Sequence, residues 1–261
     1  MTALALVGSR RAFRVVERNS RVYLRWWPVF FSTFLEPFLY LFSLGVGVGA
    51  LVGEVAGPGG TPVAYDQFVA PALVATAAMT GCVFDTTFAF FFKYKYAHTY
   101  DGMLASPLEV TDVLRGELTW AVLRSTLHAS VFFVVMALMG LVPSGWGALG
   151  VPAAALVGFA FSGAGLGLTT FMRSFFDFDY VQLAIAPLFL FSATFFPIDE
   201  YPTVVAWVVR CSPLYQGVAI ERALVLGHPS PVLLVHAAYL VVMGLVGLRV
   251  ASRRLGRMLQ P

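Results

Sequence analysis

Residues 187–227 read PLFLFSATFFPIDEYPTVVAWVVRCSPLYQGVAIERALVLG, an apolar stretch that prolines interrupt before it finishes crossing a membrane. A bilayer core about 30 Å thick needs about 20 apolar residues of helix, and the piece between Pro202 and Pro213 has about half of that. Broken backbone survives at membrane depth only when it is buried in protein or faces water. The stretch therefore predicts two short helices that dip into the membrane and return, hinged at Pro202 and Pro213.

The overall composition is that of an integral membrane protein. Of the 261 residues, 59% are hydrophobic and 12% are charged, and the mean hydropathy is +0.79, whereas soluble domains carry about 25% charged residues. The net charge of +3 and the pI near 9.0 do not indicate a nucleic-acid-binding protein, because the basic residues lie beside apolar segments. Cys82 and Cys211 show no metal or disulfide spacing and are interpreted as small hydrophobic residues. The apolar run 3–7 precedes the first arginines, the reverse of the order in a signal peptide, so we expect no cleavable signal.

Six apolar segments are long enough to cross a membrane as helices. They lie at 28–52, 66–92, 119–142, 150–172, 180–197 and 231–250. Lys and Arg gather in the flanks on one side of these segments, and such residues mark the cytoplasmic side of a membrane protein. The sequence therefore predicts an all-α polytopic membrane protein with six transmembrane helices in a single domain, 1–261, and with both termini in the cytoplasm.

Two of the six segments are rich in glycine. Small residues let helix backbones approach closely, so we expect close packing within the chain or at a dimer interface rather than ligand binding. The glycines are Gly45, Gly47 and Gly49 in the first segment and Gly163, Gly165 and Gly167 in the fourth.

Residues 10–27 precede the first apolar segment and combine arginines with residues at helical spacing. The spaced positions are Phe13, Val16, Ser20, Tyr23 and Trp27. This pattern favours an amphipathic helix that lies in the cytoplasmic headgroup layer. The alternative is a positive flank that only sets the topology.

The longest polar connection, residues 93–118, reads KYKYAHTYDGMLASPLEVTDVLRGEL. Ser106 followed by Pro107 is typical of a helix start, with serine as the cap and proline at the first helical position. We therefore expect a short helix, a break, and a second helix that runs into the third span. Such a partly apolar knob suits docking to a soluble partner, and an ordinary interfacial connector is the alternative.

Motifs for catalysis are missing from the sequence. It contains no Gly-Lys pair and therefore no phosphate-binding loop of the form G-x-x-x-x-G-K-[ST], which excludes ATP hydrolysis by that route. Asp177 and Asp179 pair two carboxylates, but a metal-dependent enzyme needs a second acidic cluster, and none is obvious. Together with Arg173 they are interpreted as a local ion-pair group, and no cofactor, metal or catalytic residue is predicted.

Four ionisable residues lie inside the predicted spans. Burying a charge in a membrane is costly, so such residues are candidates for a functional role. They are Glu36, Asp85, Arg124 and His128. Glu36, Asp85 and Arg124 fall at a similar depth, so ion pairing among them would lower the cost of burial. The sequence leaves open whether this polar cluster only holds the helices together or takes part in gating.

The layout resembles that of the ABC-2 type permeases, the membrane subunits of type V ABC exporters. The most specific part is FSATFFPIDEYPTVVAWVVRCSPLYQGVAIERALVLG at 191–227, which is similar to the family's F-F-P, [NS]-P-[LF] and acidic-Arg-x-L pattern. DGMLASPLEVTDVLRGEL at 101–118 resembles the family's E-x-G-T-L…[ST]-P-[LV] segment, although Asp101 and Met103 depart from it. LEPFLYLFSLGVGVG at 35–49 looks most like the subgroup of nodulation-factor (lipo-oligosaccharide) and daunorubicin-type drug exporters.

The resemblance implies a partner and two working regions. The partner would be a separate ABC ATPase subunit in two copies, which binds the ATP, with the permease as a homodimer or as a heterodimer with a related permease. The 93–118 segment would supply the coupling helix that seats in the ATPase, and the helix at 10–27 would also touch it. The outer re-entrant region, 197–228, would close the exit, with Glu221 and Arg222 paired to groups near the last span. The coupling residues would be Tyr100, Asp101, Gly102, Met103 and Leu104, and the gate residues Phe196, Pro197, Pro202, Pro213, Glu221 and Arg222.

We therefore expect the permease of an ATP-driven exporter in the bacterial plasma membrane. Its substrate would be a lipophilic or amphipathic drug, lipid or lipid-linked saccharide that leaves the cytoplasm or the inner leaflet. An ion-coupled secondary transporter that uses Glu36, Asp85 or His128 is one alternative. A membrane enzyme that uses Asp177 and Asp179 is the other.

Overall fold

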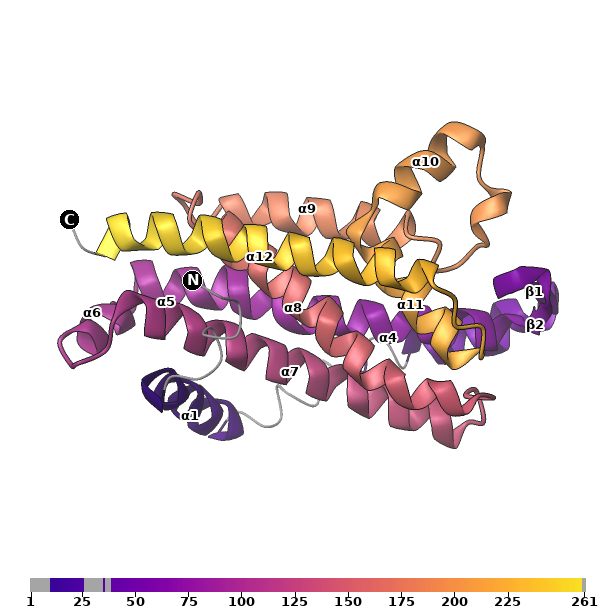
Figure 1. The fold of residues 1–261 in the computed structure, drawn as a ribbon, viewed down its shortest axis with the longest axis horizontal. Coiled ribbons are helices and arrows are strands. Elements are labelled where there is room, and N and C mark those ends of the chain that lie inside the picture. Colours follow the sequence, from indigo (N-terminus) through magenta and orange to yellow (C-terminus); the bar gives the residue numbers. More distant parts are fainter. Residues whose placement is uncertain (1–9, 26–34, 36–38, 260–261) are drawn as a thin grey trace.

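The structure is a computed structural model that describes residues 10–25, 35 and 39–259. Its long helices run side by side along one axis, which lies horizontally in Figure 1. One end carries α6 (Thr99–Leu104) and the arginine-rich last turns of α12 (Val232–Leu259), and we call it the basic end. The opposite end carries two short strands, β1 (Glu54–Ala56) and β2 (Pro62–Ala64), and we call it the hairpin end.

Four helices in the described part of the chain are long and apolar enough to cross a membrane. The first, Tyr65–Lys95, is continuous but has a π-helical turn in its middle, so that it consists of three pieces. The pieces are α4 (Tyr65–Phe84), η4 (Asp85–Ala89) and α5 (Phe90–Lys95). The other three helices are α7 (Val110–Leu138), α8 (Gly150–Thr169) with the preceding 3₁₀ turn η5 (Gly145–Leu149), and α12.

A further apolar stretch is broken into two short helices, as the prolines predict. The helices α10 (Thr203–Cys211) and α11 (Pro213–Val225) meet at an angle of 87°. The first begins directly after Pro202 and the second begins at Pro213, so both predicted hinges are confirmed. Counted as one span, the pair brings the total among the described residues to five.

The helix predicted over 180–197 ends earlier than expected. The observed helix α9 (Asp177–Leu190) has 14 residues and is therefore about 21 Å long, short of the roughly 30 Å of a bilayer core. The chain after Leu190 is irregular, and Ala193 adopts a φ of 52° that helices do not contain. Ser192, Ala193 and Thr194 are buried, so protein rather than lipid surrounds this irregular backbone. Backbone that is not helical can lie at membrane depth only under such cover or beside water.

The first predicted span, 28–52, falls largely outside the described residues. Its described part is helical from residue 39 onward and includes the π-helical turn η2 (Ser43–Val48) and α3 (Gly49–Val52). The chain then forms the antiparallel hairpin of β1 and β2, in which Val55 pairs with Val63. This hairpin, with the 3₁₀ turn η3 (Pro58–Gly60), is a small departure from the all-α prediction.

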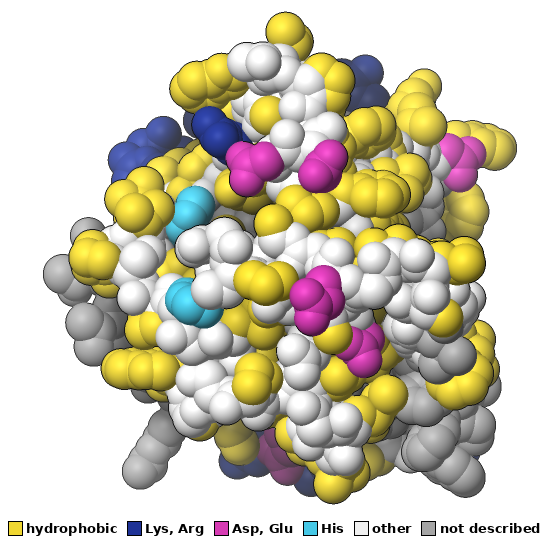
Figure 2. All heavy atoms as spheres, turned by 90° about the vertical axis from the view of Figure 1, so that its right-hand side faces the viewer, with side chains coloured by type: hydrophobic (Ala, Val, Ile, Leu, Met, Phe, Trp, Pro, Cys, Tyr) yellow, Lys and Arg dark blue, Asp and Glu magenta, His cyan; other side chains and the backbone are white. Residues whose placement is uncertain are grey.

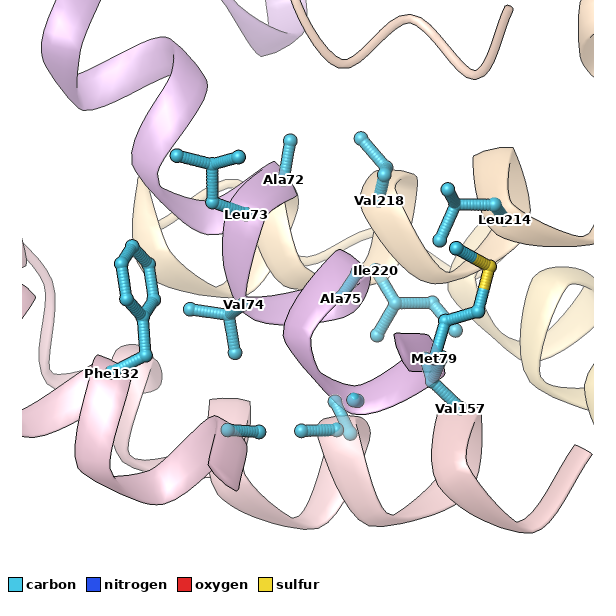
Figure 3. Packing of buried hydrophobic residues seen from close by; sticks show 14 of the residues in the cluster. Ala72, Leu73, Val74, Ala75, Met79, Phe132, Val157, Leu214, Val218 and Ile220 are labelled. Carbon is cyan, nitrogen blue, oxygen red and sulfur yellow. The ribbon is translucent and has the colours of Figure 1, made fainter. Parts of the chain in front are cut away.

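The helix α4 forms the centre of the bundle because apolar residues surround it on all sides. Figure 3 shows Leu73 and Val74 beside Phe132 of α7, and Met79 beside Val157 of α8. Leu214, Val218 and Ile220 of α11 close the remaining side of the helix (Figure 3). A helix that is hydrophobic all round is expected in the core of such a bundle.

The glycines of the fourth predicted span serve close packing, as expected. A Cβ atom at Gly163 would lie 2.3 Å from the carbonyl oxygen of Gly244, and one at Gly167 would lie 2.9 Å from that of Gly247. The helices α8 and α12 therefore touch backbone to backbone, which small residues permit. In the first predicted span, by contrast, a Cβ at Gly47 would meet nothing within 4 Å.

The predicted N-terminal helix is present as α1 (Arg10–Arg25), but its contact face differs from the predicted one. Ala12, Val15, Val16 and Asn19 are buried, whereas Phe13 is 65% exposed. The reason is visible at α7, where a Cβ on Gly116 would lie 2.5 Å from Cβ of Val15. α1 packs closely on α7, and this contact selects its buried face.

Candidate functional site

The first region of interest is the segment that joins α5 to α7 at the basic end. His98 takes a left-handed φ of 46° and turns the chain from α5 into α6. Asp101 and Gly102 of α6 are exposed, and Met103 and Leu104 are partly buried. His98 and Asp101 also pair across one turn, at 2.9 Å. The helix therefore presents a short outer face that combines charge with apolar surface.

Tyr100 is the inner anchor of this short helix. Its side chain is completely buried, and its ring lies 5.1 Å from the ring of Phe90. Burial, together with the nearby charge of Glu117, raises the pKa of the Tyr100 hydroxyl well above its ordinary value. The side chain thus faces inward, whereas Asp101 and Gly102 of the same helix are exposed.

The helix after α6 starts later than Ser106 and Pro107 predict. These two residues lie in a turn, and α7 begins at Val110. Glu109 and Asp112 form the capping box, in which each side chain accepts a backbone N–H of the other residue. This reciprocal arrangement satisfies two orphan donors of the helix end at once, which a lone serine cap does not.

The second region is the predicted polar cluster within the spans. Arg124 of α7 forms an ion pair with Asp85 of η4 and donates a hydrogen bond to the Tyr23 hydroxyl of α1 at 3.1 Å. His128 lies one turn further along α7, with Nδ1 2.9 Å from the carbonyl oxygen of Arg124. Glu36 lies outside the described residues. Two of the four predicted members, Asp85 and Arg124, therefore pair directly.

A second buried ion pair was missed by the sequence reasoning. Lys93 Nζ lies 2.7 Å from Glu117 Oε2 and 3.3 Å from Asn19 Oδ1 of α1. The Glu117 side chain is 3% exposed and that of Lys93 is 20% exposed, so the pair is largely buried. Both residues sit at the ends of predicted spans, where a charge is ordinary, so only the facing of α5 and α7 in space reveals the pair.

The third region is the hairpin end, which Figure 2 shows face-on. Acidic and histidine side chains lie over its middle, and basic side chains lie toward its margins. Phe196 is exposed and Pro197 half-buried in the irregular segment after α9, and Pro202 precedes α10. This end is therefore irregular in backbone and differs in charge from the basic end.

Arg222 holds that irregular backbone in place. The guanidinium donates to the carbonyl oxygens of Phe68 at 3.1 Å and Ala193 at 2.8 Å, and a longer contact of 3.4 Å reaches Thr194. It also lies 3.7 Å from the ring centroid of Phe68. These groups belong to α4 and to the segment after α9, which corrects the expectation of a partner near the last span.

Glu221 is the buried neighbour of Arg222 but faces another way. Its carboxylate packs against Gly150 of α8, where a Cβ would lie 3.0 Å from Oε2. Neither carboxylate oxygen has a hydrogen-bond partner among the described residues. The two neighbours therefore hold different contacts, one with backbone carbonyls and one with an apolar surface.

Asp177 and Asp179, in the first turn of α9, form no ion pair with Arg173. Asp177 accepts the backbone N–H groups of Arg173 at 2.7 Å and Ser174 at 3.1 Å. These two hydrogen bonds hold the pKa of the Asp177 carboxyl below its ordinary value. No group of three or more metal-binding side chains occurs in the described part of the chain.

Several cavities lie between or beside the described helices. One of 250 Å³ is bounded by Tyr40, by Thr76 and Thr80 of α4, and by Gln182 and Phe189 of α9. It therefore joins hydroxyl and amide groups to aromatic rings at mid-bundle. Another, of 580 Å³, opens at the hairpin end, with the β-hairpin turn, α11 and the start of α12 around it.

Comparison with known proteins identifies relatives that span most of the chain. The profile of the family described as ABC-2 type transporter matches residues 11–226. Nodulation protein J of Rhizobium leguminosarum bv. trifolii is 34% identical over 229 residues, which are 85% of this chain and 84% of the relative. The same-named protein of Rhizobium leguminosarum bv. viciae is 32% identical and covers 91% of this chain and 93% of itself. Nodulation protein J of Rhizobium meliloti is also 32% identical, over 92% of both chains.

The family match covers α1, α6, the central helices α4, α7 and α8, and the broken helix pair. It agrees with the absence of a phosphate-binding loop from the sequence, because the ATPase site of such transporters lies on another subunit. The chain belongs to the ABC-2 type transporter family, as a multi-pass membrane permease that lacks an ATPase site and works with an ABC ATPase subunit.

Proposed function

We propose that the chain is the membrane subunit of an ATP-driven exporter that moves a lipophilic or amphipathic molecule out of the cytoplasm or the inner leaflet. The observation that carries this proposal is α6, a short helix at the tip of two long helices, anchored by Tyr100 and exposed at Asp101 and Gly102. A short helix in this position can contact the ATPase subunit and pass its movement on to the membrane helices. Met103 and Leu104 add apolar surface to the same contact.

The proposal includes an orientation and an assembly. The basic end faces the cytoplasm, because Lys and Arg gather there in the way that the cytoplasmic flanks of membrane proteins do. Six spans follow if residues 28–52 form the first and if α9 with its irregular continuation forms the fifth. Two permeases, as a homodimer or with a related permease, then meet two ATPase subunits in the bacterial plasma membrane.

The proposed substrate path runs past the cavity between α4 and α9. Thr76, Thr80 and Gln182 offer hydrogen bonds there, while Tyr40 and Phe189 offer aromatic surface. A molecule with one polar and one apolar part fits this lining, so drugs, lipids and lipid-linked saccharides are the proposed classes. The resemblance to relatives named Nodulation protein J supports the lipid-linked saccharides among these proposed classes.

The hairpin end is proposed as the outer gate. Arg222 ties the irregular segment after α9 to α4 and so holds Phe196 and Pro197 at the mouth of the path. α10 and α11 turn at Pro202 and Pro213, where the backbone has no N–H to continue a helix. Movement of this region away from α4 would break a small number of hydrogen bonds and open the exit.

Reconstitution into vesicles tests the proposed function. The permease with its ATPase subunit should move a fluorescent amphiphile when ATP is supplied, and Leu104→Asp or Gly102→Pro should abolish transport because they disrupt docking. Arg253→Met, which removes an exposed cation at the same end, is the control and should transport normally. Transport by the permease alone under a proton gradient would contradict the proposal and favour an ion-coupled carrier that uses Glu36, Asp85 or His128.

A further inference from the structure

The two buried ion pairs lie on one seam, between the helix Tyr65–Lys95 and α7. In the pair nearer the basic end, Lys93 binds both oxygens of Glu117, at 2.7 and 2.9 Å. The same ammonium group donates to the side-chain oxygen of Asn19 in α1 at 3.3 Å. Three helices therefore meet at this pair.

The other pair repeats this arrangement two turns deeper in the bundle. Arg124 of α7 binds Asp85 of η4 and donates to the hydroxyl of Tyr23 in α1. Its guanidinium lies 4.7 Å from the Tyr23 ring centroid. Asn19 and Tyr23 are four residues apart and so lie on one face of α1. Each pair thus joins α1, α7 and the helix Tyr65–Lys95. In one pair α7 supplies the carboxylate, and in the other it supplies the cation.

The π-helical turn η4 brings Asp85 and Lys93 into line. In a regular α-helix two residues eight apart differ in direction by about 80°, whereas two residues seven apart differ by about 20°. Glu117 and Arg124 are seven apart, but Asp85 and Lys93 are eight apart. In η4 the N–H of Phe90 bonds to the carbonyl of Asp85, five residues back, so the turn absorbs one extra residue. Asp85 and Lys93 therefore face α7 together.

The helix α8 secures this turn from the other side. Thr169 donates to the carbonyl oxygen of Thr86 at 2.8 Å, which satisfies a backbone group inside the turn. A Cβ on Gly165 would lie 2.2 Å from the Thr86 hydroxyl, so α8 packs directly on η4. Threonine side chains commonly satisfy backbone groups at helix irregularities in membranes. The π turn is thus a built feature of the bundle.

The short helix α6 is fixed to the same seam. Tyr100 is fully buried, with its ring 5.1 Å from that of Phe90, the residue that closes the π turn. Its neighbour Glu117 belongs to the ion pair nearer the basic end. A displacement of α6 therefore acts on α5 and α7 at the point where the lysine and the glutamate hold them together.

We propose that Asp85, Lys93, Glu117 and Arg124 are positioning residues that lock α1, α5 and α7 into one body. The π turn sets their alignment, and Tyr100 joins α6 to that body. Movement of the ATPase then displaces α1, α5, α6 and α7 together rather than α6 alone. The displacement is thereby passed on to the membrane helices. This inference rests on the proposed function, because it assigns the locked body to the transmission of an ATP-driven movement.

The test is a charge exchange in the complete complex with its ATPase. Lys93→Glu and Glu117→Lys, each alone, place like charges together and should lower transport per ATP hydrolysed by about tenfold, within the range of coupling between distant sites. The double variant Lys93→Glu with Glu117→Lys restores the pair and should recover transport per ATP. Single variants with normal transport per ATP, or a folded double variant without recovery, would overturn the proposal.

A second measurement uses the permease alone and keeps the inference separate from the proposed function. α1 carries several arginines, so trypsin cleaves it once it leaves α7. Each single variant should be cleaved in α1 faster than the unaltered chain, and the charge-exchanged double variant should return to the unaltered rate. Equal rates in all four chains would refute the lock. If the unaltered complex fails to transport with ATP while the cleavage rates follow the predicted pattern, the proposed function fails and the locked body stands.

Where a single charge-reversal variant does not fold, Lys93→Arg and Lys93→Met test the role of the ion pair without introducing a like-charge contact. Arginine keeps the charge and should keep transport per ATP, whereas methionine keeps most of the volume and should lose it. Arg253→Met removes an exposed cation at the same end and should leave transport per ATP unchanged. Equal transport per ATP for the arginine and methionine variants would show that the ion pair plays no positioning role.

Discussion

The two ends of the bundle are held together in different ways. Toward the basic end, side chains of neighbouring long helices pair with each other, as Lys93 does with Glu117 and Arg124 with Asp85. At the hairpin end, the single side chain of Arg222 binds one backbone carbonyl of the irregular segment after α9 and one of α4. The first arrangement fixes helices to helices, and the second fixes a loop to a helix.

This difference suggests a division of labour in a transporter. A body of helices joined by buried pairs transmits a displacement without deforming, because separating a buried pair leaves uncompensated charges. A segment held by a few hydrogen bonds from one arginine can separate from its neighbouring helix and bind to it again. This difference is the one expected if the basic end transmits movement and the hairpin end is the proposed outer gate.

The largest effect is expected from breaking the basic end. Arg124→Met leaves Asp85 buried without its cation, and removal of one partner of a buried pair typically costs about 3–5 kcal/mol. Thermal unfolding of the detergent-solubilised protein measures the loss of stability. The conservative change Arg124→Lys keeps the charge and should lose less, and equal losses for the two variants would contradict the role of the ion pair.

A smaller effect is expected from weakening the hairpin end. Arg222→Lys keeps a cation but loses the planar fork that reaches two carbonyl groups, which should cost about 2 kcal/mol because a buried acceptor loses its donor. Melting temperature and protease access to the segment after α9 measure the change. Arg210→Met removes an exposed cation from the same region and should have little effect. Equal effects of the two variants would show that Arg222 does not hold the segment.

Overpacking the contact of α1 with α7 should lower the stability by as much as the Arg222 change or less. Gly116→Ala places a Cβ 2.5 Å from Val15 Cβ, and such overpacking costs about 1–3 kcal/mol. Circular dichroism melting measures it. Gly256→Ala in α12 is the matched control, since a Cβ there meets nothing within 4 Å. An unchanged melting temperature for Gly116→Ala would mean that α1 is not packed on α7.

The smallest effect is expected at Asp177, which lies outside both arrangements. Backbone hydrogen bonds lower the pKa of its carboxyl from the ordinary value of 3.8. A lowered pKa contributes stability above the ordinary value, and this contribution is lost as the pH falls through the folded value. The melting temperatures of the unaltered chain and of Asp177→Ala should therefore differ slightly at neutral pH and converge at pH values below that of the folded carboxyl. A difference that stays constant down to low pH would contradict this origin.

The sequence predicts the long helices and the broken pair because their signals are local. Apolar runs of sufficient length define α4, α7, α8 and α12, and Pro202 and Pro213 define where α10 and α11 begin. The pairing of Asp85 with Arg124 also follows from their similar depth in two neighbouring spans. Patterns of this kind depend on residue type and spacing alone.

Other features depend on contacts that no local pattern encodes. The run after Leu190 is as apolar as a helix, and its irregular path shows only in the packing around Ser192 and Thr194. The partners of Arg222 are backbone carbonyls, which every residue offers. The π turn at η4 likewise has no sequence signature, since it follows from the facing of α5 on α7 and of α8 on Thr86.

The most direct measurement compares the two ends during turnover. Nitroxide labels at Phe13 of α1 and at Leu138, the last residue of α7, report on whether α1 and α7 move as one body. Labels at Val204 and Leu138 report on the hairpin end, and all three positions are exposed. Pulsed electron resonance gives both distances in the complex with its ATPase, diluted with unlabelled permease and with Cys211→Ser to remove the exposed cysteine. A non-hydrolysable ATP analogue should change the Val204–Leu138 distance and leave the Phe13–Leu138 distance unchanged. A change in the Phe13–Leu138 distance with a constant Val204–Leu138 distance would contradict the account of a rigid body of helices and a moving gate.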